Sequence, residues 1–95
     1  MQIIRSDRFI VQLQNILEYI AKDKIAASIE FRKKLDKEID DLINFPYKYR
    51  QSHYCEDKDI RDMIFRGYTI VYRVNSGANL IEILTIFNRN LPPKE

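Results

Sequence analysis

The sequence contains very few of the residues that build disulfide frameworks and metal centres. Cys55 is its only cysteine and His53 its only histidine. A single thiol excludes an internal disulfide and leaves a zinc site without its usual paired ligands. We therefore expect a protein that holds no metal, and no motif in the chain calls for a cofactor.

Long apolar runs are also missing from the chain. No segment approaches the ~18 consecutive apolar residues of a membrane-spanning helix, and residues 1–7 lack the apolar centre of a signal peptide. We expect a cytoplasmic protein that does not associate with membranes.

Glycine and proline are scarce, with two and three copies in 95 residues. With 45% hydrophobic residues as well, the chain can bury a core and place most of its length in helices and strands, which argues against disorder. The length is too short for two domains, so we predict one domain over residues 1–95.

Neither sign of charge dominates, because sixteen Lys and Arg against fourteen Asp and Glu give a net charge of +2. That excess is too small to identify a nucleic-acid-binding protein. It lies in the last third of the chain, where four of the five basic residues are arginines, a residue suited to phosphate and carboxylate recognition. The four arginines are Arg61, Arg66, Arg73 and Arg89. They are either ordinary solvated charges or part of an anion-binding surface.

Two amphipathic helices are predicted in the first half of the chain. Ser6 is a suitable cap for a first helix that ends near Lys22. A second helix runs to about Asn44, where Phe45 and Pro46 stop it. The short linker between them predicts an antiparallel hairpin. The apolar stripes expected in the core are Phe9, Leu13, Ile16, Leu17 and Ile20, then Ile25, Ile29, Leu35, Ile39, Leu42 and Ile43, with Arg32 on the second seam.

The second half of the chain predicts an antiparallel meander of three strands over residues 61–65, 68–75 and 80–88. Gly67 and residues 75–79 mark turns short enough for hairpins.

The predicted elements define an α+β fold. A short N-terminal strand at Ile3 and Ile4 precedes the helix hairpin, and residues 46–58 connect the hairpin to the meander, partly anchored by tyrosines. The simplest burial scheme packs both helices on one face of the sheet and leaves the other face open.

Side chains on the middle strand alternate between the two faces of the sheet. The set expected against the helices is Tyr68, Ile70, Tyr72 and Val74, and the set expected on the open face is Thr69, Val71, Arg73 and Asn75. On the last strand both alternating sets of side chains are apolar in the middle, so periodicity does not show which set packs against the helices. If Arg89 shares the open face with Thr69 and Arg73, the sheet presents a basic surface bordered by Phe87.

Residues 60–74 and 83–89 resemble the carboxy-terminal half of the RelE/ParE superfamily, the toxins of bacterial type II toxin-antitoxin systems. The length and the helix pair fit that family as well. The resemblance implies a RelE/ParE-like fold, growth arrest, a role such as plasmid stabilization, and a cognate antitoxin that neutralises the toxin in a hetero-oligomer. RelE-like members cleave mRNA on the ribosome, whereas ParE-like members poison DNA gyrase without being nucleases.

The resemblance also implies roles for particular residues. Arg89 matches the arginine at the end of the last strand, and in a RelE-like nuclease Arg89 and Arg61 would be catalytic. Binding of the target, in either branch, is expected to involve Arg66, Arg73, Arg89 and Phe87.

Two departures from the RelE-like pattern favour the ParE-like branch. Thr69 follows Gly67 and Tyr68 where the nucleases have an arginine, and no tyrosine follows Arg89. The arginines at positions 61, 66 and 73 also look more like those of the ParE-like branch. We therefore lean towards inhibition of gyrase. The alternatives are mRNA cleavage, or an inactive relic that only binds its antitoxin.

Three other residues have competing interpretations. His53 and Cys55 could act as a general acid and a nucleophile, but they lie in a weakly patterned loop and are more simply explained as incidental. Arg73 could be only a cross-strand partner of Glu82 rather than part of a site.

Overall fold

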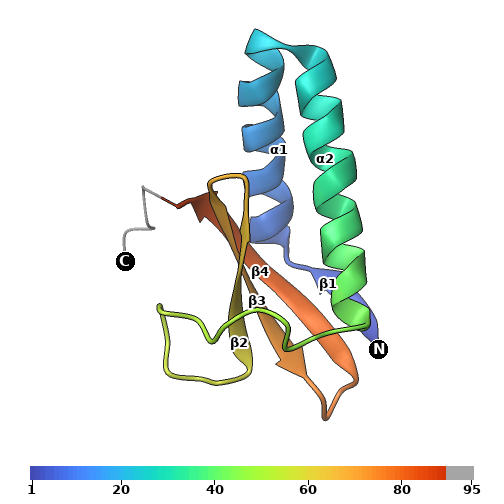
Figure 1. Cartoon of the computed structure of the whole chain (residues 1–95), viewed down its shortest axis with the longest axis vertical. Coiled ribbons are helices and arrows are strands. Elements are labelled where there is room, and N and C mark those ends of the chain that lie inside the picture. The colour runs from blue at the N-terminus through green and yellow to red at the C-terminus, as the bar shows by residue number, and fades with distance from the viewer. Residues whose placement is uncertain (90–95) are drawn as a thin grey trace.

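A computed structural model describes residues 1–89 and has the predicted α+β architecture (Figure 1). A four-stranded sheet with the order β1-β4-β3-β2 packs against a pair of helices. The strands β2, β3 and β4 form the predicted antiparallel meander, and β1 pairs with β4 in parallel. The elements are β1 (Gln2–Arg5), α1 (Asp7–Asp23), α2 (Ile25–Asp40), a 3-10 turn (Asp41–Ile43), β2 (Ile60–Phe65), β3 (Tyr68–Asn75) and β4 (Leu80–Asn88).

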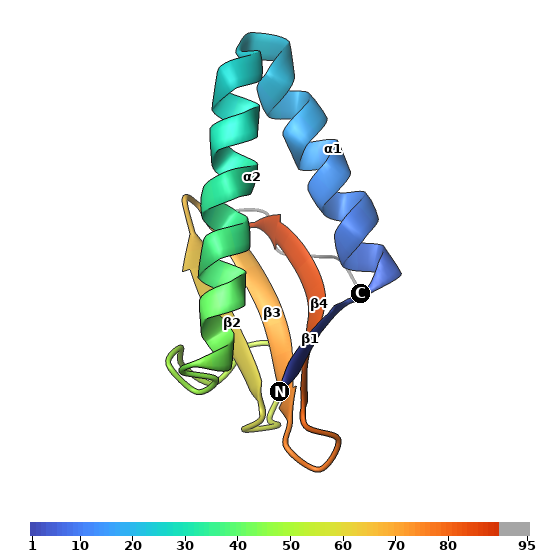
Figure 2. The ribbon, with the colours of Figure 1, turned by 90° about the vertical axis from the view of Figure 1, so that its right-hand side faces the viewer.

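The helices form the predicted hairpin, and its tip extends beyond the sheet (Figure 1). Figure 2 shows that they meet at their linker and separate towards the sheet, where α1 lies near β1 and β4. None of the described helices is long and apolar enough to cross a membrane.

Ser6 caps α1 as predicted and also ties the start of the helix to the sheet. Its Oγ accepts a hydrogen bond from the Phe9 amide at 3.0 Å and donates one to the carbonyl of Leu84 at 2.7 Å. Asp7 in the first turn and Lys22 in the last turn complement the helix dipole. Phe9 and Leu13 of the predicted stripe are buried.

The predicted stripe of α2 is wrong at both ends. Ile25, Ile29 and Ile43 are 69%, 53% and 44% exposed. The buried stripe is instead Ser28, Phe31, Leu35, Ile39 and Leu42.

Two contacts of α2 explain the shift. The Ser28 hydroxyl donates to the Leu17 carbonyl at 2.7 Å, so a small polar residue lies where the helices approach each other. The Phe31 ring meets those of Phe65 and Tyr68 edge-on, with centroid distances of 5.2 and 5.6 Å. An aromatic cluster on β2 and β3 therefore selects Phe31 over Ile29.

A bulge explains why the alternation of β4 could not choose a face. Tyr72 pairs with Ile83, but Val71 pairs with Thr85, so Leu84 is an extra residue in the strand. The bulge shifts the phase, and the residues that β4 contributes to the core are Ile81, Ile83 and Ile86. On β3 the predicted inward set is confirmed, with Ile70, Tyr72 and Val74 in the same core.

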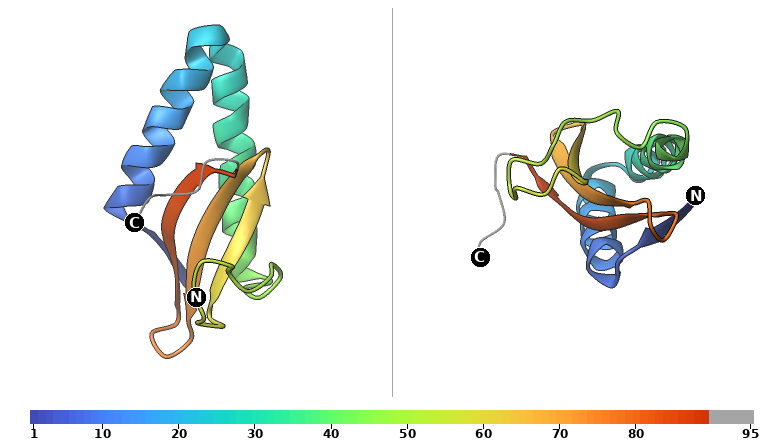
Figure 3. Two further views of the ribbon diagram at one scale, coloured as in Figure 1. Left: turned by 90° about the vertical axis from the view of Figure 1, so that its left-hand side faces the viewer. Right: turned by 90° about the horizontal axis from the view of Figure 1, so that it is seen from below.

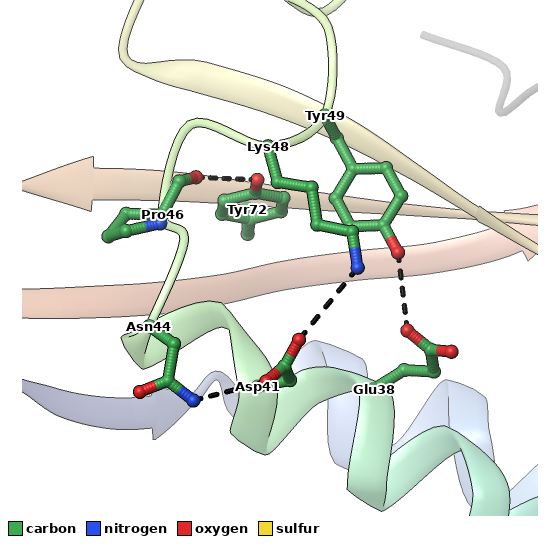
Figure 4. A network of polar contacts seen from close by, with 7 residues as sticks. All are labelled: Glu38, Asp41, Asn44, Pro46, Lys48, Tyr49 and Tyr72. Carbon is green, nitrogen blue, oxygen red and sulfur yellow. Dashed lines mark hydrogen bonds and ion pairs between the residues drawn. The ribbon is translucent and has the colours of Figure 1, made fainter.

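The connection between the 3-10 turn and β2 is anchored by tyrosines, as predicted (Figure 4). The Tyr72 hydroxyl donates to the Pro46 carbonyl at 2.7 Å, and the Tyr49 hydroxyl donates to Glu38 at 3.3 Å. Burial raises the pKa of Tyr72 to about 12. Lys48 pairs with Asp41 at 3.8 Å. These contacts hold the first half of the connection against α2 and β3.

The second face of the sheet, which faces away from the helices, is only partly open, because the connection covers it around Thr69 and Val71 but leaves Arg73 exposed. Thr69 and Val71 on that face are only 2% and 8% exposed. The left panel of Figure 3 shows α2 behind the sheet and the end of the connection crossing in front of the strands. Hydrogen bonds from Ser52 to Ile60 and from Asp62 to Arg50 attach this segment to the edge of β2.

Candidate target-binding surface

Arg89 lies beside the β2–β3 turn. Its amide donates to the Gly67 carbonyl at 2.7 Å, which joins the end of β4 to this two-residue turn. Both turn residues have positive φ, 47° at Arg66 and 84° at Gly67, as a tight hairpin turn of this length requires. We call this part of the molecule, with Arg66, Phe87 and Arg89, the Arg89 end of the sheet.

The Arg89 side chain has no partner in the part of the chain that the structure describes. It is exposed, and it forms no hydrogen bond or ion pair with other residues of the described range 1–89. Arg66 is less free, because it pairs with Glu30 of α2 at 3.3 Å and lies 5.3 Å from the Phe65 ring centroid. That ion pair is solvent-exposed and hence weak, so an anionic partner can compete for Arg66.

Phe87 adds an aromatic surface next to Arg89. It pairs in register with Thr69, and its ring meets the Tyr54 ring edge-on with a centroid distance of 5.3 Å. A hollow of about 450 Å³ opens beside it between α1 and the end of β4. Its lining is Gln12, Asn15, Ile16, Tyr19, Tyr68, Ile86, Phe87 and Asn88.

The contribution of α1 to this hollow was missed by sequence reasoning. Tyr19 is 71% exposed and lies outside the predicted apolar stripe. Its position off the stripe was the only available signal, and a weak one, because a single exposed aromatic side chain is common on protein surfaces.

Arg73 lies far from the Arg89 end. It is exposed, and it pairs in register with Ile60 on one side and Glu82 on the other. The predicted cross-strand position opposite Glu82 is therefore confirmed, although no ion pair joins these two described residues. Arg73 is six residues along β3 from Gly67, or about 20 Å at the usual rise of a strand.

Arg61 is held at the start of β2 by the connection. Its Nε donates to the Lys58 carbonyl at 3.0 Å and its Nη1 donates to the Tyr49 carbonyl at 3.1 Å. Its guanidinium also lies 4.8 Å from the ring centroid of Tyr47. We call this region the Arg61 end.

The structure does not bring Arg61 and Arg89 together. Arg61 pairs with Tyr72, whereas Arg89 bonds to Gly67, five residues away along β3. This separation corresponds to about 17 Å of strand.

His53 and Cys55 lie in the segment over the second face. His53 is exposed and Cys55 is partly exposed. Within residues 1–89, His53 bonds through its backbone amide, which donates to Asp62. Asp62 is 2% exposed and escaped sequence reasoning, because a single acidic residue in a strand carries no pattern. No group of three or more His, Cys, Asp or Glu within residues 1–89 could hold a metal ion.

Known proteins were compared with the chain by family model, by curated sequence and by solved structure. Residues 3–90 match a family model described as the ParE toxin of the type II toxin-antitoxin system parDE. A solved structure titled "Chromosomal ParDE TA system from P. aeruginosa" has a similar fold, with a TM-score of 0.73 and 14% identity. The match covers 93% of this chain and 95% of that one. No curated protein matches the sequence.

Proposed function

Because the chain belongs to the ParE toxin family of type II toxin-antitoxin systems, we propose that it arrests bacterial growth by inhibiting DNA gyrase in the cytoplasm. A cognate antitoxin holds it inactive in a hetero-oligomer. The target is bound at the Arg89 end, where Arg89, Arg66 and Phe87 lie together, and Arg73 makes a separate contact.

The observation that carries this proposal is the exposed guanidinium of Arg89, which has no partner among residues 1–89. It stands exposed beside a hollow with an aromatic lining, while its backbone is fixed to the β2–β3 turn. A cation on a rigid support next to apolar surface is the usual arrangement of a binding hot spot. Arg89 is therefore suited to hold an acidic or phosphate group of a macromolecular target.

Two features favour binding over RNA cleavage. Metal-free phosphoryl chemistry needs several charged groups positioned around one phosphate. Arg61, the second catalytic candidate, donates to two backbone carbonyls about 17 Å of strand away from Arg89. Thr69, which stands where the nucleases have an arginine, is 2% exposed.

The antitoxin is proposed to cover the helix hairpin. The hairpin exposes large apolar side chains along both helices, and exposed apolar surface of this kind is what a protein partner covers. The most exposed are Ile10, Val11, Tyr19, Ile25 and Ile29.

The test is induction of the chain alone in a bacterium at verified soluble expression. We expect growth arrest with a DNA-damage response and accumulation of gyrase-cleaved DNA. Arg89→Ala should relieve the arrest, whereas Arg8→Ala, which removes an exposed arginine of α1, should not.

The other outcomes separate the alternatives. Strong codon-phased cuts in ribosome-bound mRNA without DNA damage would replace gyrase inhibition by RNA cleavage. Unaffected growth with soluble wild-type protein would leave only the inactive relic.

A further inference from the structure

Residues 52–55 lie over the second face of the sheet, and we call this segment the cover. The amide of His53 donates to Oδ2 of Asp62 at 3.1 Å, and the Tyr54 ring packs edge-on against Phe87. The left panel of Figure 3 shows this part of the connection in front of the strands. Thr69 is almost fully buried on the same face.

Asp62 is incompletely satisfied under the cover. Its Oδ2 accepts the His53 amide, but its Oδ1 is buried without a hydrogen-bond partner among residues 1–89. A buried carboxylate oxygen without a donor is unfavourable. The closed cover is therefore destabilised relative to any arrangement in which Oδ1 gains a donor.

Arg73 can supply that donor. Val71 pairs with Asp62 in register, and Arg73 follows two residues later on the same face of β3. Diagonal neighbours of this kind have Cβ atoms about 7–8 Å apart, within reach of an arginine side chain. Arg73 is exposed and has no ion pair within the described residues, and Glu82, opposite it on β4, is the competing carboxylate.

We propose that the cover opens, and that Asp62 then exchanges the His53 amide for the guanidinium of Arg73. Opening separates Tyr54 from Phe87 and uncovers Thr69. The cover thus gates the second face beside the Arg89 end. Only its meaning for toxicity rests on the proposed function, because opening is a property of the free chain.

Exchange of the His53 amide hydrogen, followed by NMR on the purified full chain, measures opening directly. This amide exchanges only when its bond to Asp62 breaks, so its rate follows the open population. Arg73→Gln leaves the closed contacts intact but removes the partner of the open state, and it should slow exchange about threefold, as expected for an exposed ion pair. Asp62→Asn keeps an acceptor for His53 without the buried charge, and it should slow exchange about tenfold.

Arg8→Gln is the matched control, because it removes the same charge from an exposed position on α1 and should leave the rate unchanged. Labelling of Cys55, the only thiol and a member of the cover, should rank the variants in the same order. Exchange in Arg73→Gln that equals or exceeds the wild-type rate would overturn the proposal, even if Asp62→Asn fails to fold. The measurement needs no growth assay, so its failure is distinct from failure of the gyrase hypothesis.

Discussion

Arg61 and Arg89 lie at opposite ends of one sheet and use the same side chain differently. At the Arg61 end the guanidinium donates to two carbonyls of the connection and lies against Tyr47. At the Arg89 end the backbone amide donates to the Gly67 carbonyl, and the exposed guanidinium has no partner within the described range 1–89. Both arginines stand in strand motifs that resemble a toxin signature, so the partners of each guanidinium, rather than the motif, separate a structural residue from a binding residue.

The largest effect on stability is expected at the Arg61 end. Arg61→Ala removes two hydrogen bonds from a charged donor and a cation–π contact, and it should lower the free energy of unfolding by about 2–3 kcal/mol. Urea denaturation followed by circular dichroism measures this change. If Arg61→Ala unfolds with a free energy within about 0.5 kcal/mol of wild type, the usual size of a surface change, Arg61 is not a structural residue. The distinction between Arg61 and Arg89 would then fall.

A smaller loss is expected for Tyr72→Phe, which removes the hydrogen bond to the Pro46 carbonyl in the same region. The expected cost is about 1 kcal/mol, the usual net value of one such bond. The connection should remain in place because Tyr49 and Lys48 still fasten it.

Tyr72→Phe should also change the dependence of stability on pH. Burial raises the pKa of Tyr72 from 10.0 to about 12, so the unfolded chain releases this proton first. Stability from Tyr72 is therefore present below pH 10 and falls as the pH rises towards about 12. Wild type should lose stability more steeply than Tyr72→Phe across this interval. Parallel curves from denaturant titrations at each pH would contradict the assignment.

Arg66→Ala should have the smallest measurable effect on stability. Its pair with Glu30 is exposed on both sides, so the loss should be below about 0.5 kcal/mol. Growth arrest should weaken less than in Arg89→Ala, because Arg66 is already partly engaged by Glu30. A stability loss as large as that of Arg61→Ala would place Arg66 with the structural arginines.

Local patterns predicted most of the fold. The cap at Ser6, the hairpin of helices and the three strands of the meander follow from short-range chemistry and are present in the structure. The bulge at Leu84 was beyond reach, because the contacts that accompany it come from Ser6 and Gln12, more than 70 residues away. The exposure of Ile29 also depends on contacts between residues distant in sequence, because the aromatic cluster around Phe31 forms only in the folded sheet.

The candidate site was predicted less completely than the fold. Arg66, Phe87 and Arg89 could be named from their motif and do lie at one end of the sheet. Which guanidinium is free could not be predicted, because it depends on where the connection places its carbonyls. The cover over Thr69 and the buried state of Asp62 depend on the same unpatterned segment.

The most direct test compares purified Arg89→Ala with wild type in a gyrase supercoiling assay. Arg8→Ala serves as the charge-matched control, and urea denaturation verifies that both variants keep wild-type stability. We expect the half-inhibitory concentration of Arg89→Ala to rise roughly a hundredfold, as for loss of a charged hot spot, and that of Arg8→Ala to stay unchanged. Folded Arg89→Ala that inhibits gyrase as strongly as wild type would contradict the assignment of target binding to the Arg89 end.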